Sequence, residues 1–335
     1  MGARMIDIAR DLGVSLMTVS KALRSHSDIS EETRTRVMKR ARELDYRPNW
    51  IARSLVTRRT YVIGLVIPDL MHSFFAEVAK GVTRKFEPLN YQIIIANSDE
   101  NAEIEERQVE LLLARNVDGL ILASTQPNAR RGLFRTLESR EVPYVLVDRA
   151  PAGLEAHFVG VKDEEIGAMA VEHLIEQGCR RIAHIRGPAI PPGTGRLRGY
   201  TRTLAKHGLK SPPEYVVSGQ HQDGSGYEAM RQLLRLTPPP DGVFCYNDPV
   251  AAGAIKAVLE AGLRVPEDIA IIGAGNVHYS DLLRVPLSTI DQSSCSIGET
   301  AAELLVSCIE SKTPVPIKRI LIAPQLVVRE SSRRS

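Results

Sequence analysis

Residues 5–23 read MIDIARDLGVSLMTVSKAL, and this stretch predicts two short helices joined by a tight turn. Apolar residues repeat at helical spacing on either side of Gly13, a residue suited to a left-handed helix end. Ser15 follows, where its hydroxyl can cap the second helix. Two helices separated by so little chain must cross steeply, as in a helix-turn-helix, and the second then fits the major groove of DNA. The alternative is a two-helix corner of an ordinary helical domain.

Charge is distributed unevenly along the chain. The first 60 of its 335 residues hold 13 Lys and Arg against 7 Asp and Glu, so they carry +6, whereas the whole chain carries +3. A length of this order suggests two or three domains. A basic head on a slightly acidic body indicates that the head meets a polyanion such as DNA. The alternative is a basic face that is merely solvated.

A third helix and a basic connection follow the helix pair. Ser30 precedes residues 31–46, EETRTRVMKRARELDY, whose apolar side chains share one stripe. Pro48 then ends the run, because the residue before a proline avoids helical angles. We therefore expect a helix-turn-helix DNA-binding domain over residues 1–46. Residues 47–60 are too few for a helix that is stable alone, so they are either a hinge helix that folds against a partner or a linker.

No segment of the chain has the pattern of an export signal or a membrane span. The N-terminal MGARMIDIAR lacks an apolar core, and the longest apolar runs fall far short of the roughly 20 residues that cross a bilayer. The cysteines are dispersed and form no CxxC pair, so we expect buried free thiols in a reducing cytoplasm and neither a metal site nor a cofactor. They are Cys179, Cys245, Cys295 and Cys308.

From residue 61 onward, apolar runs alternate with amphipathic stretches. Strands are predicted in YVIGLVIP, YQIIIAN, DGLILAS, PYVLVD, RIAHIRG, YVVSG, DGVFCYN and DIAIIGAG. Helices are predicted over 74–86, 103–114, 132–139, 164–177, 197–207, 226–236 and 250–261. Continuous apolar strands between helices are typical of parallel sheets that are covered on both faces. About nine such units are too many for one simple sheet, so we expect an α/β fold with two lobes and a cleft between them.

Polar side chains follow the predicted strands directly. Ligands of parallel sheets bind beyond the carboxyl ends of the strands, so these groups are expected to converge on the cleft. They are donors and acceptors suited to hydroxyls or to a polar ring. The set includes Asp69, Asn97, Ser98, Asp99, Ser124, Asp148, Arg149, Arg186, Asn247, Asp248 and Asn276.

The sequence carries no pattern for catalysis or for nucleotide binding. Gly273 and Gly275 follow a strand as in a dinucleotide fold, but the third position is His278, and no acidic residue closes the next strand. There is no HExxH, no P-loop and no Ser/His/Asp order. His184, inside an apolar strand, is expected to be a hydrogen-bonded core residue. A solute-binding protein of a transporter would need an export signal and no basic head.

Linked motifs extend over nearly the whole chain: MIDIARDLGVSLMTVSKAL, ISEETRTRVMKRARELDYRPNWIARSL, IGLVIPDLMHSFFAEVAKGV, DGLILAS, VLVDR, CYNDPVAAGAIKAVLEAGLRVPEDIAIIG and LSTIDQ. Together they resemble the LacI/GalR family of bacterial transcription regulators. The resemblance implies a homodimer that represses a promoter at a pseudo-palindromic operator in double-stranded DNA and responds to a small molecule, expected to be a carbohydrate. It also implies two lobes like those of type I periplasmic sugar-binding proteins, over 61–160 with 291–319 and over 161–290 with 320–335.

The resemblance assigns the second helix of the head to the major groove. Leu16 and Met17 stand where family members choose their operator, and both are apolar side chains that suit a thymine methyl. Lys21 stands where many relatives have arginine, and it can still reach a guanine with less geometric definition. Thr18 and Ser20 are expected to touch phosphate or a base edge.

The hinge segment carries two further expected DNA contacts. Leu55, in ARSL, matches the leucine that the family inserts into the minor groove at the operator centre. Arg53 is expected at the phosphates. Paired hinge helices from two chains would then kink the DNA. A linker without this role is the alternative.

The resemblance also assigns side chains to the ligand cleft. Phe75 matches an aromatic that packs on the ligand, and Arg196 matches an arginine that grips it. Asp69 can instead cap the next helix. Many sugar-responsive relatives carry an aspartate where this chain reads Ala274-Gly275-Asn276, and an asparagine offers one acceptor and two donors instead. The candidates are Asp69, Phe75, Asp148, Arg149, Arg196, Asn247 and Asn276.

Overall fold

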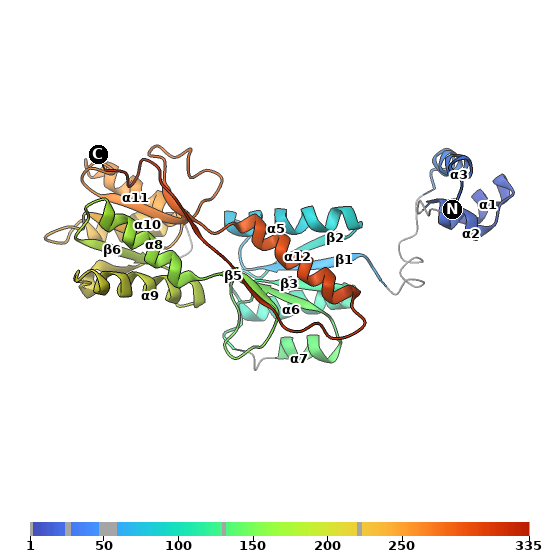
Figure 1. Cartoon of the computed structure of the whole chain (residues 1–335), viewed down its shortest axis with the longest axis horizontal. Coiled ribbons are helices and arrows are strands. Elements are labelled where there is room, and N and C mark those ends of the chain that lie inside the picture. The colour runs from blue at the N-terminus through green and yellow to red at the C-terminus, as the bar shows by residue number, and fades with distance from the viewer. Residues whose placement is uncertain (1–2, 24–27, 47–58, 129–131, 220–222, 335) are drawn as a thin grey trace. The chain divides into compact units, whose positions relative to one another are not determined.

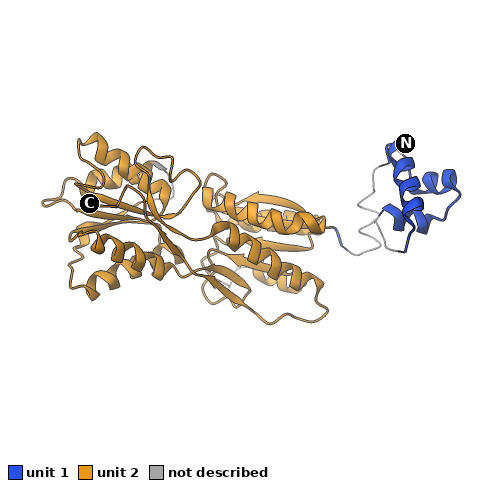
Figure 2. Cartoon of the chain, turned by 45° about the horizontal axis from the view of Figure 1, so that its top comes forward, with its two compact units in different colours: residues 1–60 blue, residues 61–335 orange. Residues whose placement is uncertain are grey.

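The chain forms two compact units (Figure 2). The computed structural model describes residues 3–23, 28–46, 59–128, 132–219 and 223–334. One unit is Met1–Thr60, which we call the head unit, and the other is Tyr61–Ser335, which we call the large unit. No helix among the described residues is both long and apolar enough to cross a bilayer.

Helices make up the described part of the head unit: α1 (Met5–Leu12), α2 (Leu16–Leu23) and α3 (Glu31–Glu43). Their apolar stripes close on a small core in which Ile8, Val19 and Val37 are fully buried. The predicted helix pair and the helix after it are confirmed. The third helix ends at Glu43, three residues before the end of the predicted segment.

Short-range hydrogen bonds fix where these helices begin and end. Gly13 has φ 67°, and its left-handed backbone lets its N–H return to the end of α1. The hydroxyl of Ser15 accepts a hydrogen bond from the backbone N–H of Thr18 at 3.0 Å. Ser30 caps α3 in the same way, at 3.3 Å. Caps of this kind stabilise a helix by about 1 kcal/mol each, and both predicted caps of the helix pair are confirmed.

Two six-stranded sheets form the framework of the large unit (Figure 1). The first has the order β11-β5-β4-β3-β1-β2 and is parallel; with its helices it forms the N-lobe. The second, in the C-lobe, has the order β12-β10-β9-β8-β6-β7 and is parallel except at β12, which runs antiparallel to β10. The strands are β1 (Val62–Ile67), β2 (Gln92–Asn97), β3 (Gly119–Leu122), β4 (Tyr144–Val147), β5 (Phe158–Val161), β6 (Ile182–Arg186), β7 (Val216–Ser218), β8 (Gly242–Cys245), β9 (Ala270–Gly275), β10 (Ser288–Asp291), β11 (Arg319–Ile322) and β12 (Gln325–Val327).

Helices cover both faces of each sheet, as the apolar strands predicted. In the N-lobe, α5 and α12 lie on one face and α6 and α7 on the other; in the C-lobe, α8 and α9 lie opposite α10 and α11. The helices are α5 (Ser73–Phe86), α6 (Ala102–Ala114), α7 (Gly132–Ser139), α8 (Asp163–Glu176), α9 (Pro191–Lys206), α10 (Asp223–Leu233), α11 (Asp248–Glu260) and α12 (Ser294–Glu310), with short turns of 3-10 helix at Glu87–Leu89 and Pro213–Tyr215.

Glycines let one helix pair in each lobe pack backbone against backbone. A Cβ at Gly81 of α5 would lie 2.0 Å from the carbonyl oxygen of Cys295 in α12, and one at Gly199 of α9 would lie 2.1 Å from that of Glu164 in α8. Such distances exclude any side chain. In both lobes, therefore, glycines allow two neighbouring helices on one face of the sheet to approach closely.

Among the described residues, the chain crosses between the lobes three times. β5 leads into α8, β10 into α12, and β11 into β12. The predicted boundaries at 160 and 319 fall inside N-lobe strands, which continue to Val161 and Ile322, and the predicted boundary at 290 falls inside β10, which continues to Asp291. The run ILIAPQLVVRE is not one strand: Pro324 cannot donate to a ladder and separates two strands that belong to different sheets.

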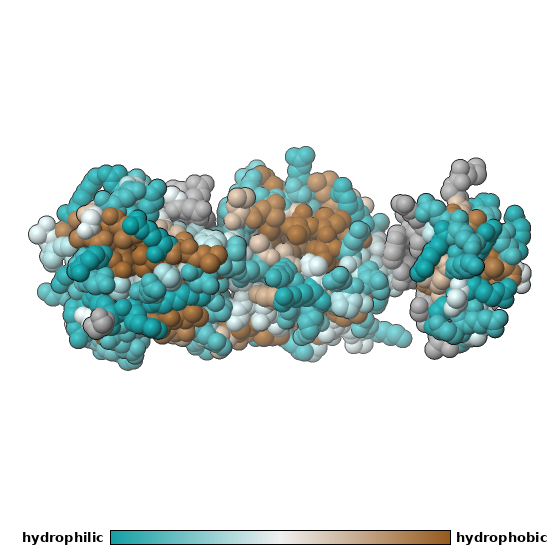
Figure 3. All heavy atoms as spheres, turned by 90° about the horizontal axis from the view of Figure 1, so that it is seen from above, coloured by the Kyte–Doolittle hydropathy of each residue, from teal (hydrophilic) through white to brown (hydrophobic). Residues whose placement is uncertain are grey.

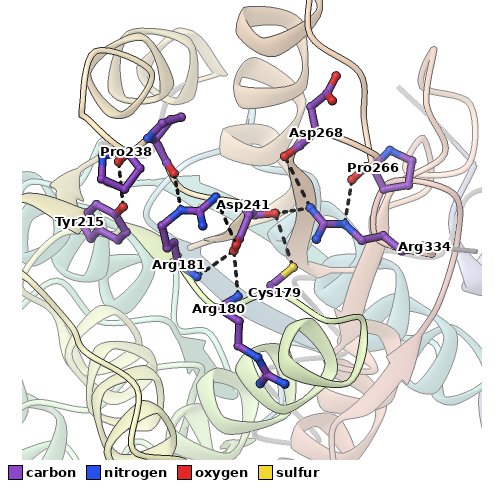
Figure 4. A network of polar contacts seen from close by, with 10 residues as sticks. Cys179, Arg180, Arg181, Tyr215, Pro238, Asp241, Pro266, Asp268 and Arg334 are labelled. Carbon is purple, nitrogen blue, oxygen red and sulfur yellow. Dashed lines mark hydrogen bonds and ion pairs between the residues drawn. The ribbon is translucent and has the colours of Figure 1, made fainter.

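Arg334 fastens the end of the described chain to the C-lobe (Figure 4). Its guanidinium donates to the carbonyls of Pro266 at 3.0 Å and Asp241 at 2.6 Å, and its backbone N–H donates to Gln177 Oε1 at 2.9 Å. The Asp241 carboxylate in turn accepts from the backbone N–H of Arg181 at 2.8 Å. The segments that lead into β6, β8 and β9 are thereby tied together at one end of the sheet.

Two of the four cysteines are the buried free thiols that the sequence predicted. Cys179 and Cys245 are buried, and burial raises the pKa of Cys179 to about 11. The prediction was wrong for Cys295 and Cys308, which are only partly buried. Both lie on α12, a helix that the sequence patterns did not identify and whose outer side faces solvent.

His184 should make the large unit less stable in acid. The ring is fully buried, stacks on Phe244 at 4.6 Å between centroids, and donates from Nδ1 to the Phe244 carbonyl at 2.9 Å, so the predicted core role is confirmed. Burial lowers its pKa to about 4 from an ordinary 6.5. The unfolded chain therefore binds this proton first, and stability is lost as pH falls from about 6.5 to 4, by up to about 3 kcal/mol. In urea unfolding of His184→Phe across this range, the free energy of unfolding should depend less on pH than in the unsubstituted protein. An unchanged pH dependence would contradict the role given to His184.

Candidate DNA-binding and ligand-binding sites

The helix α2 presents an apolar tip to solvent. Leu16 is 49% exposed and Met17 is 63% exposed, whereas Val19 and Ala22 on the opposite side are buried in the core of the head unit. Two large apolar side chains at the start of a helix offer no hydrogen bonds, but they can contact thymine methyl groups in the major groove. The amphipathic pattern of α2 thus separates a packing face from a face free for a partner.

The polar candidates on α2 are already engaged in short-range contacts. The Thr18 hydroxyl lies 2.8 Å from the Ser15 hydroxyl, and Lys21 forms an ion pair with Asp28. Ser20 is half-buried. A DNA contact by Lys21 therefore exchanges the Asp28 carboxylate for a phosphate or a base. The other two candidates, Arg53 and Leu55, lie outside the described residues.

A small cavity lies between the two lobes of the large unit, at the carboxyl ends of their strands. Its volume is about 30 Å³, close to the share of one water molecule in the liquid, and we call it the inner cavity. Five of the predicted ligand residues line it: Phe75, Asp148, Arg149, Arg196 and Asn247. The other lining residues are His72, Phe74, Glu100, Ile190, Tyr246, Ala274, Gly275 and Gln292.

Arg196, on α9, is the most heavily bonded side chain of this cavity. It is 3% exposed, and its guanidinium donates to Asp163 Oδ1 at 3.1 Å, to the carbonyl of Tyr246 at 2.6 Å and to Gln292 Oε1 at 2.9 Å. It also lies 4.8 Å from the centre of the Tyr246 ring. These partners belong to the start of α8, the end of β8 and the crossing from β10 to α12. Arg196 is therefore fixed in place before any ligand binds.

Asp148 and Arg149 reach the cavity from the end of β4. Asp148 has φ 62°, a left-handed turn that brings two consecutive side chains to the same cavity. Arg149 donates from Nη2 to Glu100 at 2.9 Å, while its buried Nε has no hydrogen-bond partner among the described residues. Burial raises the pKa of Asp148 to about 7; Arg149 opposes this rise and Asp163 adds to it. Near neutral pH, Asp148 can thus donate to a ligand hydroxyl or accept from one.

Asn247 and His72 connect the two lobes. Each caps a helix: Asn247 Oδ1 accepts from the backbone N–H of Val250 at 3.0 Å, and His72 Nδ1 accepts from that of Phe74 at 3.3 Å. The Asn247 Nδ2 and His72 Nε2 atoms are 3.0 Å apart across the cleft. The lobes are therefore in contact, and a ligand larger than water enters the inner cavity only if this contact opens.

Two of the seven ligand candidates, Asp69 and Asn276, do not line the inner cavity. Of the wider set of side chains that follow strands, the same is true of Asn97, Ser98, Asp99, Ser124, Arg186 and Asp248. Asp69 Oδ1 accepts from the backbone N–H of Met71 at 2.8 Å, while His72 caps α5. Asn276 donates to Asp291 Oδ2 at 3.0 Å and accepts from Arg329 at 2.8 Å, so both ends of its amide are occupied. The neighbouring Gly275 lines the cavity instead.

Several lining residues that could not be predicted from the sequence come from places other than strand ends. His72 is a helix cap, Glu100 lies in a turn three residues beyond β2, and Gln292 lies in a crossing between the lobes. Tyr246 directly follows β8, one position before Asn247, and it could have been selected by the rule that selected Asn247. Phe74 is buried and also lines the cavity.

Similarity to known proteins covers nearly the full length of the chain. Residues 4–49 match the model of "Bacterial regulatory proteins, lacI family", and residues 171–332 match that of a periplasmic binding protein-like domain. The ribose operon repressor of Escherichia coli is 33% identical over 332 residues, which is 98% of this chain and 100% of that protein. The transcriptional repressor PurR of Escherichia fergusonii is 35% identical over 332 residues, covering 98% and 96%.

Solved structures show the same architecture. The lac repressor dimer bound to operator and the anti-inducer ONPF superposes with a TM-score of 0.87 at 25% identity, covering 99% of both chains. A complex of the transcriptional regulator CelR with cellobiose has a TM-score of 0.74 at 30% identity, covering 98% and 99%. With a helix-turn-helix head and a two-lobed large unit, the chain belongs to the LacI family and is a DNA-binding transcriptional regulator controlled by a small molecule, not an enzyme.

Proposed function

We propose that this regulator acts in the cytoplasm as a homodimer and binds a pseudo-palindromic operator. Residues 1–46 would read the two half-sites, and residues 47–60 would form the hinge, with Arg53 at phosphates and Leu55 in the minor groove. The observation that carries the proposal is the exposed apolar tip of α2 on a head that carries +6. Thr18, Ser20 and Lys21, beside this tip, would supply the polar contacts to phosphate and base edges.

Apolar surface on the large unit supports self-association. Figure 3 shows apolar side chains gathered on both lobes in one face of the molecule. Large exposed apolar residues include Leu70, Met71 and Ile95 in the N-lobe and Leu282 in the C-lobe, and Met71 is 89% exposed. Apolar side chains gathered as in Figure 3 are typical of interaction sites in soluble proteins.

The inner cavity supports a carbohydrate as the effector. It combines two aromatic rings, Phe75 and Tyr246, with hydrogen-bond donors and acceptors. Asp148, Arg149 and Asn247 supply these polar groups. Hydroxyls can donate to carboxylates and accept from guanidinium and amide groups, and apolar faces of a sugar ring can pack on aromatic rings. The names of two similar proteins, the ribose operon repressor and the CelR–cellobiose complex, also point to sugars.

Ligand and DNA would be coupled through the closure of the lobes. A ligand between His72 and Asn247 changes how the N-lobe and C-lobe meet, and in a dimer this changes the separation of the two hinge segments. Such coupling requires that the ligand bind the two states with different affinity, and DNA binding then alters ligand affinity by the same factor.

Operator binding should fall steeply with salt. A dimer with 6–10 phosphate contacts loses roughly 10³–10⁵-fold in affinity between 50 and 200 mM salt. Fluorescence anisotropy with an operator selected from genomic fragments measures this slope. Lys21→Ala should reduce the slope by about 1 for each phosphate that the lysine neutralises, whereas Lys39→Ala, an exposed lysine on α3, is the matched control. Equal affinity for operator and random DNA at every salt concentration would refute the proposal.

A further inference from the structure

A second, larger cavity adjoins the inner one. It has a volume of about 600 Å³ and lies between β5 and β11 of the N-lobe and the first turns of α8 and α9 of the C-lobe. We call it the outer chamber. Asp148 and Arg149 line both cavities, so they form the neck between them.

The two cavities differ in volume so much that only the outer chamber has room for a small molecule in this conformation. Small-molecule sites usually have about 300–1,000 Å³, and the outer chamber lies within this range while the inner cavity holds about one water. The outer chamber is therefore open in the same conformation in which His72 and Asn247 close the inner cavity. A ligand that filled only the inner cavity would leave the outer chamber to water.

The neck carries unmet hydrogen-bonding capacity. Arg149 is 3% exposed, and its buried Nε has no partner among the described residues although its Nη2 binds Glu100. A buried N–H without an acceptor is unfavourable, and a ligand oxygen at the neck would relieve it. Asp148, beside it, offers a carboxyl group to the same ligand. A hydroxylated or glycosidic segment that passes through the neck can accept a hydrogen bond from Arg149 Nε and form another with the Asp148 carboxyl group.

The walls of the outer chamber favour a neutral ligand. Four acidic side chains, Asp148, Asp163, Glu164 and Glu165, face four basic ones, Arg149, Lys162, Arg198 and Arg319. Because acidic and basic side chains are equal in number and Asp148 is partly protonated near neutral pH, the walls carry only a small net charge and an anion gains little net attraction. A neutral ligand with many hydroxyls, by contrast, finds donors and acceptors on every side.

Arg319 and Arg198 are the side chains of the outer chamber best placed to bind hydroxyls. The Arg319 guanidinium lies 4.6 Å from the centre of the Phe158 ring, and no ion pair joins it to a carboxylate within the described part of the chain. Arg198 pairs with Glu164 at 3.5 Å and is 59% exposed. Both can donate to a ligand without breaking a buried contact.

We propose that the effector is a neutral glycoside of at least two sugar units. One ring occupies the inner cavity once the contact between His72 and Asn247 opens to admit it. The glycosidic link passes Asp148 and Arg149 at the neck, and the second ring lies in the outer chamber against Arg198 and Arg319. This inference rests on the proposed carbohydrate response and specifies the size of the ligand.

Calorimetric titration of the full-length protein tests this with glucose, galactose, xylose and ribose against cellobiose, maltose, lactose and xylobiose. At least one disaccharide should bind tenfold or more tightly than its own monosaccharide. Arg198→Ala and Arg319→Ala should each raise the dissociation constant of that disaccharide about five- to tenfold and leave the dissociation constant of the monosaccharide unchanged. Arg202→Ala is the matched control, because Arg202 is also an exposed α9 arginine paired with Glu164 but does not line the chamber.

Two results would overturn the inference, and they are distinguishable. If a monosaccharide binds as tightly as every disaccharide and the two arginine variants change nothing, the effector occupies the inner cavity alone and the carbohydrate response stands. If no sugar of either size binds while the protein still selects an operator, the carbohydrate proposal fails together with this inference.

Discussion

Replacing Arg196 by methionine should lower the free energy of unfolding of the large unit by about 3–5 kcal/mol, because it leaves a buried carboxylate without its partner. The side chain of Asp163 is only 14% exposed, and Arg196 Nε is its ion-pair partner at 3.1 Å. The substitution also removes the donors to Gln292 and to the Tyr246 carbonyl. Arg196 therefore holds the cleft together as well as facing it, and loss of effector response in this variant alone would not identify a ligand contact.

Urea unfolding followed by circular dichroism measures the effect of Arg196→Met. Arg264→Met is the control, because Arg264 pairs with Asp268 on the surface and such pairs contribute about 0–1 kcal/mol. The double variant Arg196→Met, Asp163→Leu removes both charges and should recover part of the loss. A loss below about 1 kcal/mol for the single variant would show that the buried charge is not what stabilises the cleft.

Asp248→Ala should destabilise the large unit by about 4 kcal/mol. The Asp248 carboxylate is fully buried and accepts hydrogen bonds from the Val277 backbone N–H at 3.0 Å, the Ser280 hydroxyl at 2.8 Å and the Thr289 hydroxyl at 2.6 Å. Each buried donor left unpaired costs about 1–3 kcal/mol. Asp248 therefore has a structural role, because its hydrogen bonds join the start of α11 to the loop after β9 and to β10.

A thermal melt detects the Asp248→Ala change, at about 2–4 °C for each kcal/mol in a domain of this size. Hydrogen exchange adds a local readout, because the amide of Val277 should lose protection first. Asp248→Asn keeps one acceptor oxygen and should lose less stability than the alanine variant. If the asparagine and alanine variants have the same melting temperature, the hydrogen bonds of Asp248 are not the source of its contribution to stability.

The elements that could be predicted from sequence are those with strong local signals. The first two helices have a cap at Ser15 and a left-handed glycine at Gly13, and long apolar strands such as β1 and β9 have no alternative to burial. β5 and β10 escaped prediction, and β10 reads Ser-Thr-Ile-Asp, which has little apolar content. Their burial is decided by neighbours distant in sequence, which local periodicity does not contain.

The residues of the candidate ligand site also divide into those with a local sequence signal and those placed by distant parts of the chain. Asp148, Arg149 and Asn247 were predicted because each directly follows a strand, where a parallel sheet brings side chains together. Gln292 was not, because its position depends on the crossing between lobes. Asn276 also follows a strand, yet it takes a left-handed φ of 49° and turns to Asp291 and Arg329 instead. Which of two polar neighbours faces the cleft depends on a backbone turn that residue type alone does not specify.

The three crossings have a consequence for how the protein is made. The N-lobe needs α12 and β11, so it cannot complete its fold until a ribosome has synthesised the chain past Ile322, and the C-lobe needs β12 and must wait until the chain is past Val327. The helices of the head, by contrast, pack only residues that emerge at the start of translation. A nascent chain can therefore carry a folded DNA-binding head before the ligand-binding unit has completed its fold.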